Sequence, residues 1–225
     1  MSGYGNTFQL WREAAEPAWR DYTHHPFVEG LRDGSLPRKA FLHYLAQDYI
    51  YIHHFARAWA LWVVKAETTE EMRACVAIVN ASISDEMRLH IVTCAAEGLS
   101  EADLIDAEEA PETLAYTRYV LDAGHSGDFL DLMAVLAPCV FGYGEIGLRM
   151  TREGHAPLYA DWIATYAGED FQNSCREVGA LIDGAVARRL GKAPATSPRW
   201  PRLARGFATA TRLEAAFWEM GLRGA

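Results

Sequence analysis

The sequence has few cysteines and no pattern of β-strands. Only 4 of its 225 residues are cysteines, and no two of them form a Cys-x-x-Cys pair. This spacing argues against a disulfide scaffold and against a zinc site built on such pairs. No segment alternates β-branched with polar residues over the length of a strand, so we expect no β-sheet.

Positive charge and long apolar runs are also scarce. Lys and Arg number 21 against 30 Asp and Glu, which gives a formal net charge of −9. Binding to a phosphate backbone needs a basic face, so we expect no nucleic-acid partner. The longest apolar stretch, 132–143, is shorter than the ~20 residues that span a bilayer, and residues 1–9 are too polar for a signal peptide. We therefore expect no membrane partner and a cytoplasmic location.

The sequence does contain a series of amphipathic helical patterns with helix start and stop signals. Predicted helices cover 7–23 with a kink or restart at Pro17, a short segment that follows His25-Pro26-Phe27 and ends at Gly34, 37–66 capped by Ser35, 69–98 opened by a capping box at Thr68, a short one after Ser100, 111–123, 128–153, 156–167, 169–190 and 202–220. The segment 191–198 is a short linker before the last helix. These patterns predict an all-α, single-domain helical bundle over residues 1–225.

Ionisable or reactive side chains interrupt the apolar faces of three predicted helices. They are Asp48 beside Tyr44, Tyr51 and Phe55, Cys139 beside Tyr143, and Glu214 in the last helix. A carboxylate that faces a core must be paired, hydrogen-bonded or protonated. One interpretation is a buried hydrogen-bonded network or an ion pair with an arginine. The other is a pocket that these groups share.

Such a pocket would suit a flat heterocycle that carries an amino group beside a ring nitrogen. An ionised carboxylate accepts a hydrogen bond from the amino group, and a protonated one donates to a ring nitrogen. Tyrosine faces pack against the ring. The thiol of Cys139 would then attack an electron-poor ring carbon.

Short motifs over nearly the whole chain resemble, in the same order, those of the TenA (thiaminase II) family. They are His25-Pro26-Phe27, Gly34-Ser35-Leu36-Pro37, Gln47-Asp48-Tyr49-Ile50-Tyr51, His54-Phe55, Glu86 to His90, Ala115-Tyr116-Thr117, Pro138-Cys139 to Tyr143-Gly144-Glu145, Trp162 to Gly168, and Glu214 to Trp218. The resemblance implies a haem-oxygenase-like fold and an aminopyrimidine aminohydrolase or thiaminase II. It also implies a homotetramer, and neither a metal nor an organic cofactor.

The resemblance also implies a role for each matching residue. Cys139 corresponds to the nucleophile, Glu214 to the proton donor to the pyrimidine ring, Asp48 to the carboxylate that holds the amino group, Tyr51 to a tyrosine that raises the nucleophilicity of the cysteine, and Tyr116, Tyr143 and Tyr166 to substrate-binding tyrosines. Tyr116 and Tyr166 come from the resemblance alone. The implied reaction releases ammonia from an aminomethyl-pyrimidine, or thiazole from thiamin, and leaves hydroxymethyl-pyrimidine.

Some residues depart from the family pattern, and two other functions stay open. Gly142 and Gly144 stand where bulkier residues are usual, so we expect them to enlarge or loosen the pocket. A metal-dependent oxygenase would draw ligands from His24, His53, His54, His90, Glu86 and Glu145, although no Glu-x-x-His pair is present. A non-catalytic pyrimidine-binding regulator would keep the aromatic residues, but the presence of both Cys139 and Glu214 argues against it.

Overall fold

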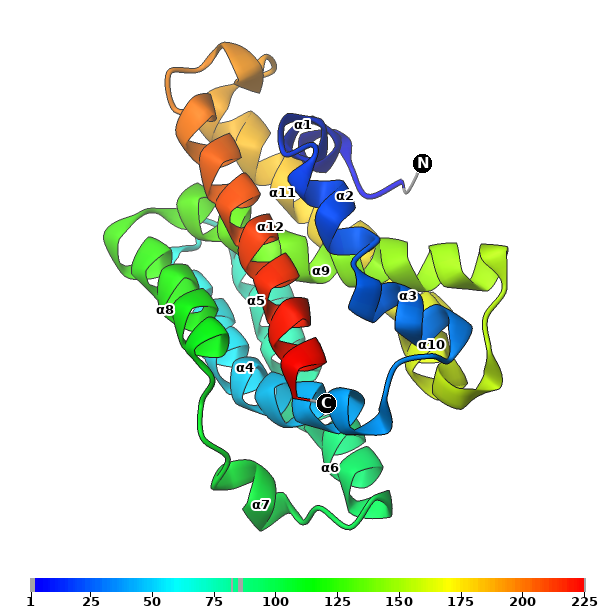
Figure 1. The fold of residues 1–225 in the computed structure, drawn as a ribbon. Helices are drawn as coiled ribbons and strands as arrows, with labels where there is room; N and C mark the ends of the chain where they lie inside the picture. Colours follow the sequence, from blue (N-terminus) through cyan, green and yellow to red (C-terminus); the bar gives the residue numbers. More distant parts are fainter. Residues whose placement is uncertain (1–2, 82, 85–86, 225) are drawn as a thin grey trace. The chain divides into compact units, whose positions relative to one another are not determined.

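The computed structural model describes residues 3–81, 83–84 and 87–224. Within these ranges the structure contains helices and no β-strand, which confirms the all-α prediction (Figure 1). The helices are α1 (Asn6–Ala14), α2 (Ala18–Thr23), α3 (Pro26–Asp33), α4 (Arg38–Lys65), α5 (Thr69–Ala81), α6 (Met87–Ala96), α7 (Glu101–Ile105), α8 (Pro111–Ser126), α9 (Phe129–Glu153), α10 (Ala160–Ala167), α11 (Glu169–Leu190) and α12 (Trp200–Arg223). The 3₁₀ turns η2 (Pro157–Tyr159) and η3 (Pro194–Thr196) are also present.

The described residues form two compact units, each built from segments far apart in the sequence. Unit 1 consists of the residues up to Leu36 and those from Met133 to Trp218. Unit 2 consists of the residues from Pro37 to Leu132 and those from Glu219 onward. The single domain over 1–225 stays a prediction. Its short linker, 191–198, falls between the end of α11 and the start of α12.

Several helix ends lie where local sequence signals predicted them. In α3, the ring Nδ1 of His25 accepts a hydrogen bond from the backbone N–H of Phe27 (3.2 Å), and Pro26 occupies the first turn. The helix ends at Gly34, whose φ of 79° is in the left-handed region that favours glycine. In α5 the expected capping box is present, because Thr68 Oγ1 accepts from the N–H of Glu71 (3.1 Å).

The predicted helix over 7–23 restarts at Pro17, which is one of the two outcomes expected there. Helix α1 ends at Ala14 and α2 begins at Ala18, since Pro17 cannot donate the hydrogen bond that would continue the first helix. One predicted cap was wrong: Ser35 does not cap the long helix, and Pro37 stands at its N-cap. Of the predicted helix over 69–98, the structure describes α5 up to Ala81, a π-helical turn at 83–84 and α6 from Met87 to Ala96; residues 82 and 85–86 lie outside the described residues.

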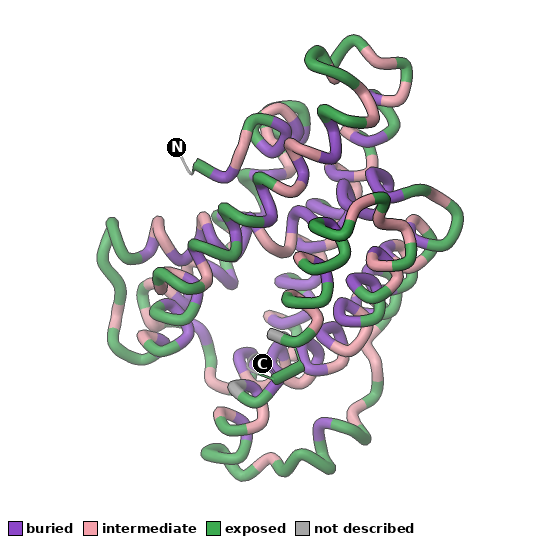
Figure 2. Tube along the Cα trace, turned by 180° about the vertical axis from the view of Figure 1, so that it is seen from behind, coloured by how far each residue is buried: buried purple, intermediate pink, exposed green. Residues whose placement is uncertain are grey.

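In unit 2, α4 is the central helix and packs against α5, α6, α7 and α8. Its inward face is aromatic over its whole length, from Phe41 through Tyr51 to Trp62. Trp62 donates from Nε1 to the carbonyl oxygen of Phe129 (2.9 Å), so its polar atom is satisfied in the core. Figure 2 shows the alternation of buried and exposed positions along such helices.

In unit 1, α1 packs against α11, and α10 also packs against α11 (Figure 1). The core here is a cluster of aromatic rings from α1, α2 and α12. Trp11 and Trp19 stack on Phe207 at centroid distances of 5.7 and 5.5 Å. These contacts hold the C-terminal helix to the N-terminal ones within the unit.

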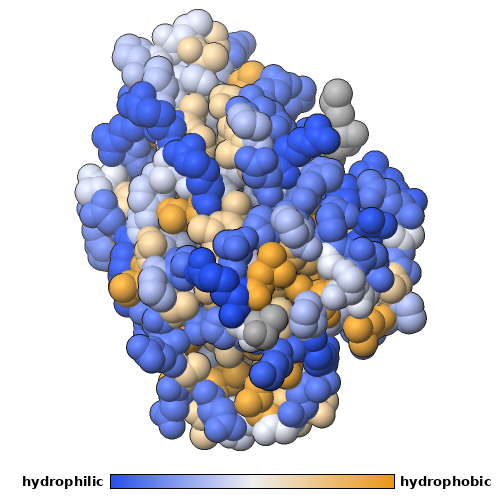
Figure 3. Space-filling model, viewed as in Figure 1, coloured by the Kyte–Doolittle hydropathy of each residue, from blue (hydrophilic) through white to orange (hydrophobic). Residues whose placement is uncertain are grey.

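Helix α9 is long and apolar. By length and composition it could cross a membrane, and it is longer than the apolar stretch 132–143. However, 89% of its most apolar window is buried within the protein, as in the core helix of a soluble protein. On the surface, hydrophilic residues cover most of the face in Figure 3.

Two glycines of α9 accommodate tyrosine rings, which corrects the expectation that they enlarge the pocket. A Cβ atom at Gly142 would lie 2.1 Å from Cε1 of Tyr22, and one at Gly144 would lie 2.8 Å from the hydroxyl of Tyr4. Both tyrosines are buried. The space that the glycines leave is therefore filled by aromatic side chains of the same unit.

We expect Gly142→Ala to destabilise the protein by about 1–3 kcal/mol, the usual cost of overpacking a core. The ring of Tyr22 cannot easily retreat, because it packs on Trp19 and Trp218 at 5.7 and 6.2 Å. Gly184→Ala in α11 is the matched control, since its Cβ would meet only the mobile end of Arg188. Equilibrium urea unfolding measures both, and equal free energies of unfolding for the two variants would contradict the prediction.

Candidate active site

Cys139 differs in accessibility from the other three cysteines of the chain. It lies on α9 and is half-buried, whereas Cys75, Cys94 and Cys175 are fully buried. Burial raises the pKa of these three thiols, to about 12 for Cys75 and Cys175 and about 11 for Cys94. Because the thiolate is the nucleophilic form, these three thiols are poorly suited to react. Cys139 is the cysteine that a ligand could reach.

Tyr143, one turn after Cys139, is part of an aromatic cluster in unit 1. Its ring centroid lies 4.8 Å from that of Tyr166 on α10 and 5.3 Å from that of Trp218 on α12. Tyr166 in turn lies 4.7 Å from Trp162. The structure thus brings together Tyr143 and Tyr166, the two predicted substrate-binding tyrosines of this unit.

Helices α9 and α12 touch at two points within unit 1. A Cβ atom on Gly206 of α12 would lie 3.4 Å from Cγ1 of Val135 on α9. Further along both helices, the ring of Trp218 meets that of Tyr143. The first distance is that of ordinary van der Waals contact, and the two rings make the second contact.

Cys139 and Glu214 lie on the segments of α9 and α12 between these two contact points. Glu214 is 2% exposed, so its carboxyl group is withdrawn from water. Unit 1 therefore holds the predicted nucleophile and the predicted acid on neighbouring helix segments, next to the aromatic cluster. No sequence pattern could show that these two helix segments are neighbours, because Cys139 and Glu214 are 75 positions apart.

Asp48 lies in a buried hydrogen-bonded network of unit 2. Its Oδ2 atom accepts from the hydroxyl of Tyr44 (3.0 Å) and lies 2.7 Å from Nε2 of His90 on α6. Asp48 is 4% exposed and His90 is 1% exposed. The carboxylate thus has hydrogen-bonding partners in the core, and they are a tyrosine and a histidine, not an arginine.

Tyr51 and Tyr116 also come together in unit 2. Their rings stack at a centroid distance of 4.9 Å and an interplanar angle of 28°. Tyr51 is one turn after Asp48 on α4, and Tyr116 comes from α8. These are the three predicted site residues of this unit. Two of them, Asp48 and Tyr51, lie one turn apart on α4, and the third, Tyr116, packs against Tyr51.

Gln47 is a positioning residue that sequence reasoning missed. Its Oε1 accepts from the N–H of Ala110 (2.9 Å) and the hydroxyl of Thr113 (2.7 Å). Its Nε2 donates to the carbonyl oxygen of Glu108 (2.9 Å). These bonds attach the start of α8 to α4 and so set the position of Tyr116. The signal available in the sequence was that Gln47 directly precedes the predicted site residue Asp48.

His90 is the second missed residue, since it was considered only as a metal ligand or as half of a surface pair with Glu86. Glu86 lies outside the described residues, and His90 is buried rather than on the surface. Met87, His90 and Cys94 are all buried on α6. Their spacing of three and four residues was the signal that His90 faces the core.

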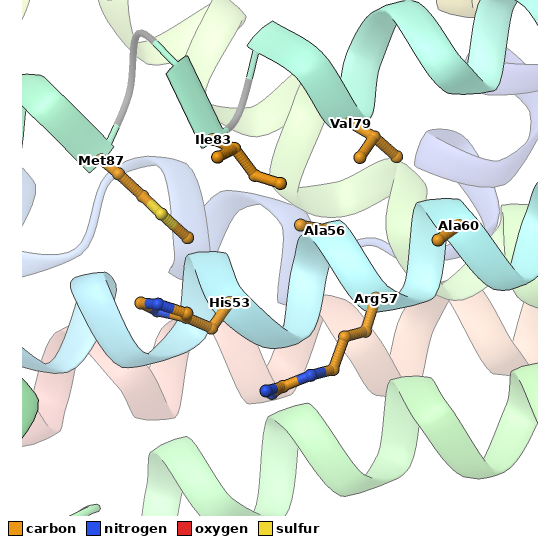
Figure 4. A pocket seen from close by; sticks show the side chains of 7 residues that line it. All are labelled: His53, Ala56, Arg57, Ala60, Val79, Ile83 and Met87. Atoms are coloured by element: carbon orange, nitrogen blue, oxygen red, sulfur yellow. The ribbon is translucent and has the colours of Figure 1, made fainter.

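A pocket of about 320 Å³ lies elsewhere in unit 2, at α4, α5 and α6 (Figure 4). Its lining consists of His53, Ala56, Arg57, Ala60, Val79, Ile83 and Met87. None of the predicted site residues lines it. The lining residues that the structure describes are mostly aliphatic.

The metal-ligand interpretation finds little support in the side-chain contacts. Among the residues that the structure describes, no three His, Cys, Asp or Glu side chains are grouped so as to hold a metal ion. Glu145 accepts from Nε1 of Trp19 (2.9 Å) and lies 3.3 Å from Nε of Arg12. Nε2 of His90 is directed at Asp48. Both candidate ligands thus have protein partners.

The helical architecture is that of a known class. A solved structure from Shewanella denitrificans, described as a domain of unknown function with a haem-oxygenase-like fold, has a TM-score of 0.73 to this chain at 14% identity and covers 97% of this chain and 92% of that one. The predicted haem-oxygenase-like fold is thereby confirmed. The chain belongs to the TENA/THI-4/PQQC family, whose sequence model matches residues 12–224.

Two more similar proteins carry functional names. A solved structure from Silicibacter sp., described as a TenA family transcription regulator, is 60% identical, has a TM-score of 0.96 and covers 97% of each chain. A curated protein from Halalkalibacterium halodurans, named aminopyrimidine aminohydrolase, is 34% identical over 92% of each chain.

Proposed function

We propose that this protein is an aminopyrimidine aminohydrolase that takes part in thiamin salvage. It would cleave an aminomethyl-pyrimidine to hydroxymethyl-pyrimidine and ammonia, thiamin to hydroxymethyl-pyrimidine and thiazole, or both. The observation that carries the proposal is the accessible Cys139 thiol on α9 beside the segment of α12 that carries buried Glu214. The name of the Halalkalibacterium relative supports hydrolysis of an aminopyrimidine.

In the proposed reaction, the sulfur of Cys139 forms a bond to the ring carbon next to the nitrogen that Glu214 protonates. The ring amino nitrogen then supplies the electron pair that expels the amine from the exocyclic methylene, and the amine takes up the proton that the thiol gave up and leaves as ammonia. Water adds to this methylene and its released proton returns to the sulfur as the bond from carbon to sulfur breaks, and the ring proton returns to Glu214. Each step pairs a nucleophile with an acid or base, as covalent catalysis requires.

The proposed roles in unit 2 are those of binding and activation. Asp48 would accept a hydrogen bond from the ring amino group, which increases the electron supply from that nitrogen. Tyr116 would pack against the ring, Tyr51 would assist the thiol, and the tyrosine cluster of unit 1 would contribute Tyr143 and Tyr166. The stacked Tyr51 and Tyr116 rings support these roles, because stacking restricts both rings.

A transcription regulator is the alternative that the description of the Silicibacter structure suggests. The charge of this chain disfavours it, because a net charge of −9 opposes binding to a phosphate backbone. The presence of Cys139 and Glu214 favours catalysis over pyrimidine binding alone. We therefore retain the hydrolase as the proposal.

We propose a cytoplasmic homo-oligomer, a tetramer by resemblance to the family. Several large apolar side chains on unit 2 support an assembly, since they are exposed in the single chain. They include Val64 (80% exposed), Ile105 (64%) and Val92 (62%). Sedimentation of the purified chain measures the assembly, and a monomer at micromolar concentration would contradict it.

A product assay by mass spectrometry tests the proposed function. The purified, metal-stripped protein is given aminomethyl-pyrimidine and, separately, thiamin. We expect hydroxymethyl-pyrimidine from at least one of them, and the ratio of the two rates identifies the preferred leaving group. If neither substrate gave product, the hydrolase proposal would be wrong and a binding role would replace it.

A further inference from the structure

The carboxylate of Asp48 is held by two donors from two different helices, and both bind the same oxygen. Tyr44 reaches Oδ2 from one turn earlier on α4, and His90 reaches it from α6. Two donors on one carboxylate oxygen fix the rotation of the carboxyl group about its bond to Cβ. The other oxygen, Oδ1, is then presented in a single direction.

The atom types fix which group donates. An ionised carboxylate only accepts hydrogen bonds, so both Tyr44 Oη and His90 Nε2 must carry the hydrogen. The distance of 2.7 Å from His90 Nε2 to Oδ2 is in the range of charge-assisted hydrogen bonds, which are stronger than neutral ones. His90 and Asp48 are both buried, which limits competition from water.

We propose that His90 is a positioning residue for the recognition of the ring amino group. By holding Oδ2, it directs Oδ1 of Asp48 to accept the hydrogen bond from that group. Tyr44 alone could not do this, because it shares a helix with Asp48 and leaves the carboxylate without a contact from a second element. The inference rests on the proposed function, and it assigns to His90 a part in choosing aminopyrimidines over pyrimidines without the amino group.

The test measures this preference directly, by calorimetric titration of the full-length protein. The two ligands are hydroxymethyl-pyrimidine and its analogue with hydrogen in place of the ring amino group. We expect His90→Leu, which lacks a donor, and His90→Asn, whose amide is too short to reach Oδ2, to reduce the preference for the amino compound about 10- to 100-fold. This corresponds to losing one hydrogen bond to a charged group. His90→Gln should restore most of the preference, because its amide extends to about the position of Nε2.

His53→Leu is the matched control, since the ring of His53 bonds the backbone carbonyl oxygen of Tyr49 and does not touch Asp48. It should keep the wild-type preference. Wild-type preference in both His90→Leu and His90→Asn, or equal losses in His90→Gln and His90→Asn, would overturn the role of His90 and leave the proposed function intact. If the wild-type protein bound neither ligand, the proposed function would fail, and the role of His90 with it.

Discussion

Cys139→Ala is expected to lower the rate of hydroxymethyl-pyrimidine formation by about 10⁴-fold or more, the scale seen when a covalent nucleophile is removed. The substitution takes away the atom that forms the bond to the ring, while alanine fits the same helical position on α9. The measurement is the initial rate at saturating substrate. Binding of the pyrimidine should change far less, because the tyrosine cluster around Tyr143 is untouched.

Cys75→Ala is the matched control for the nucleophile. Cys75 is fully buried on α5, and burial raises the pKa of its thiol to about 12. Its removal should leave the rate of turnover unchanged. Iodoacetamide gives a second readout, since it should alkylate Cys139 first in the folded protein. Equal rates for Cys139→Ala and the wild type would mean that another group is the nucleophile.

Glu214→Gln should reduce turnover by about 10²- to 10⁴-fold, the usual contribution of a positioned general acid. Glutamine keeps the shape and a hydrogen-bond donor but cannot transfer a proton to the ring nitrogen. The dissociation constant of the product should therefore rise by less than the fall in turnover. Single-turnover rates and calorimetric titration measure the two quantities separately.

Glu219→Gln on the same helix is the control for this substitution, since Glu219 is exposed. It removes one negative charge from α12 at a position on its outer face. If it slowed turnover as much as Glu214→Gln, a general loss of charge would explain both effects. Unchanged turnover in Glu214→Gln would exclude the acid role.

Most of the helices and the chemical identity of the site residues could be predicted from the sequence. Helical spacing placed Tyr44, Asp48 and Tyr51 on one face of α4, and the structure shows all three buried there. The capping box at Thr68 located the start of α5, and Gly34 located the end of α3. Local signals of this kind act within one or two helical turns, so they can be recognised in the sequence before the fold is known.

The errors share a cause, which is that long-range packing decides between local alternatives. The comparison with the family pattern treated Gly142 as an opening, but Tyr22 from α2 fills the space beside it. The spacing from Glu86 and the search for metal ligands treated His90 as a surface or metal-binding residue, but His90 bonds Asp48 across 42 positions of sequence. In each case the contacting residue comes from another helix, and no local sequence pattern predicts which residue it is.

The sequence by itself determined the all-α class and the aromatic helix faces, and it predicted a cysteine, two acids and four tyrosines as site residues. Only the tertiary structure decided which of these residues meet within each unit, Tyr143 with Tyr166 and Tyr51 with Tyr116, and that His90 bonds Asp48. It also decided which of the four thiols is accessible. The physical reason is that burial and hydrogen-bond partners depend on contacts between helices, whereas helix formation depends chiefly on neighbours three and four residues apart.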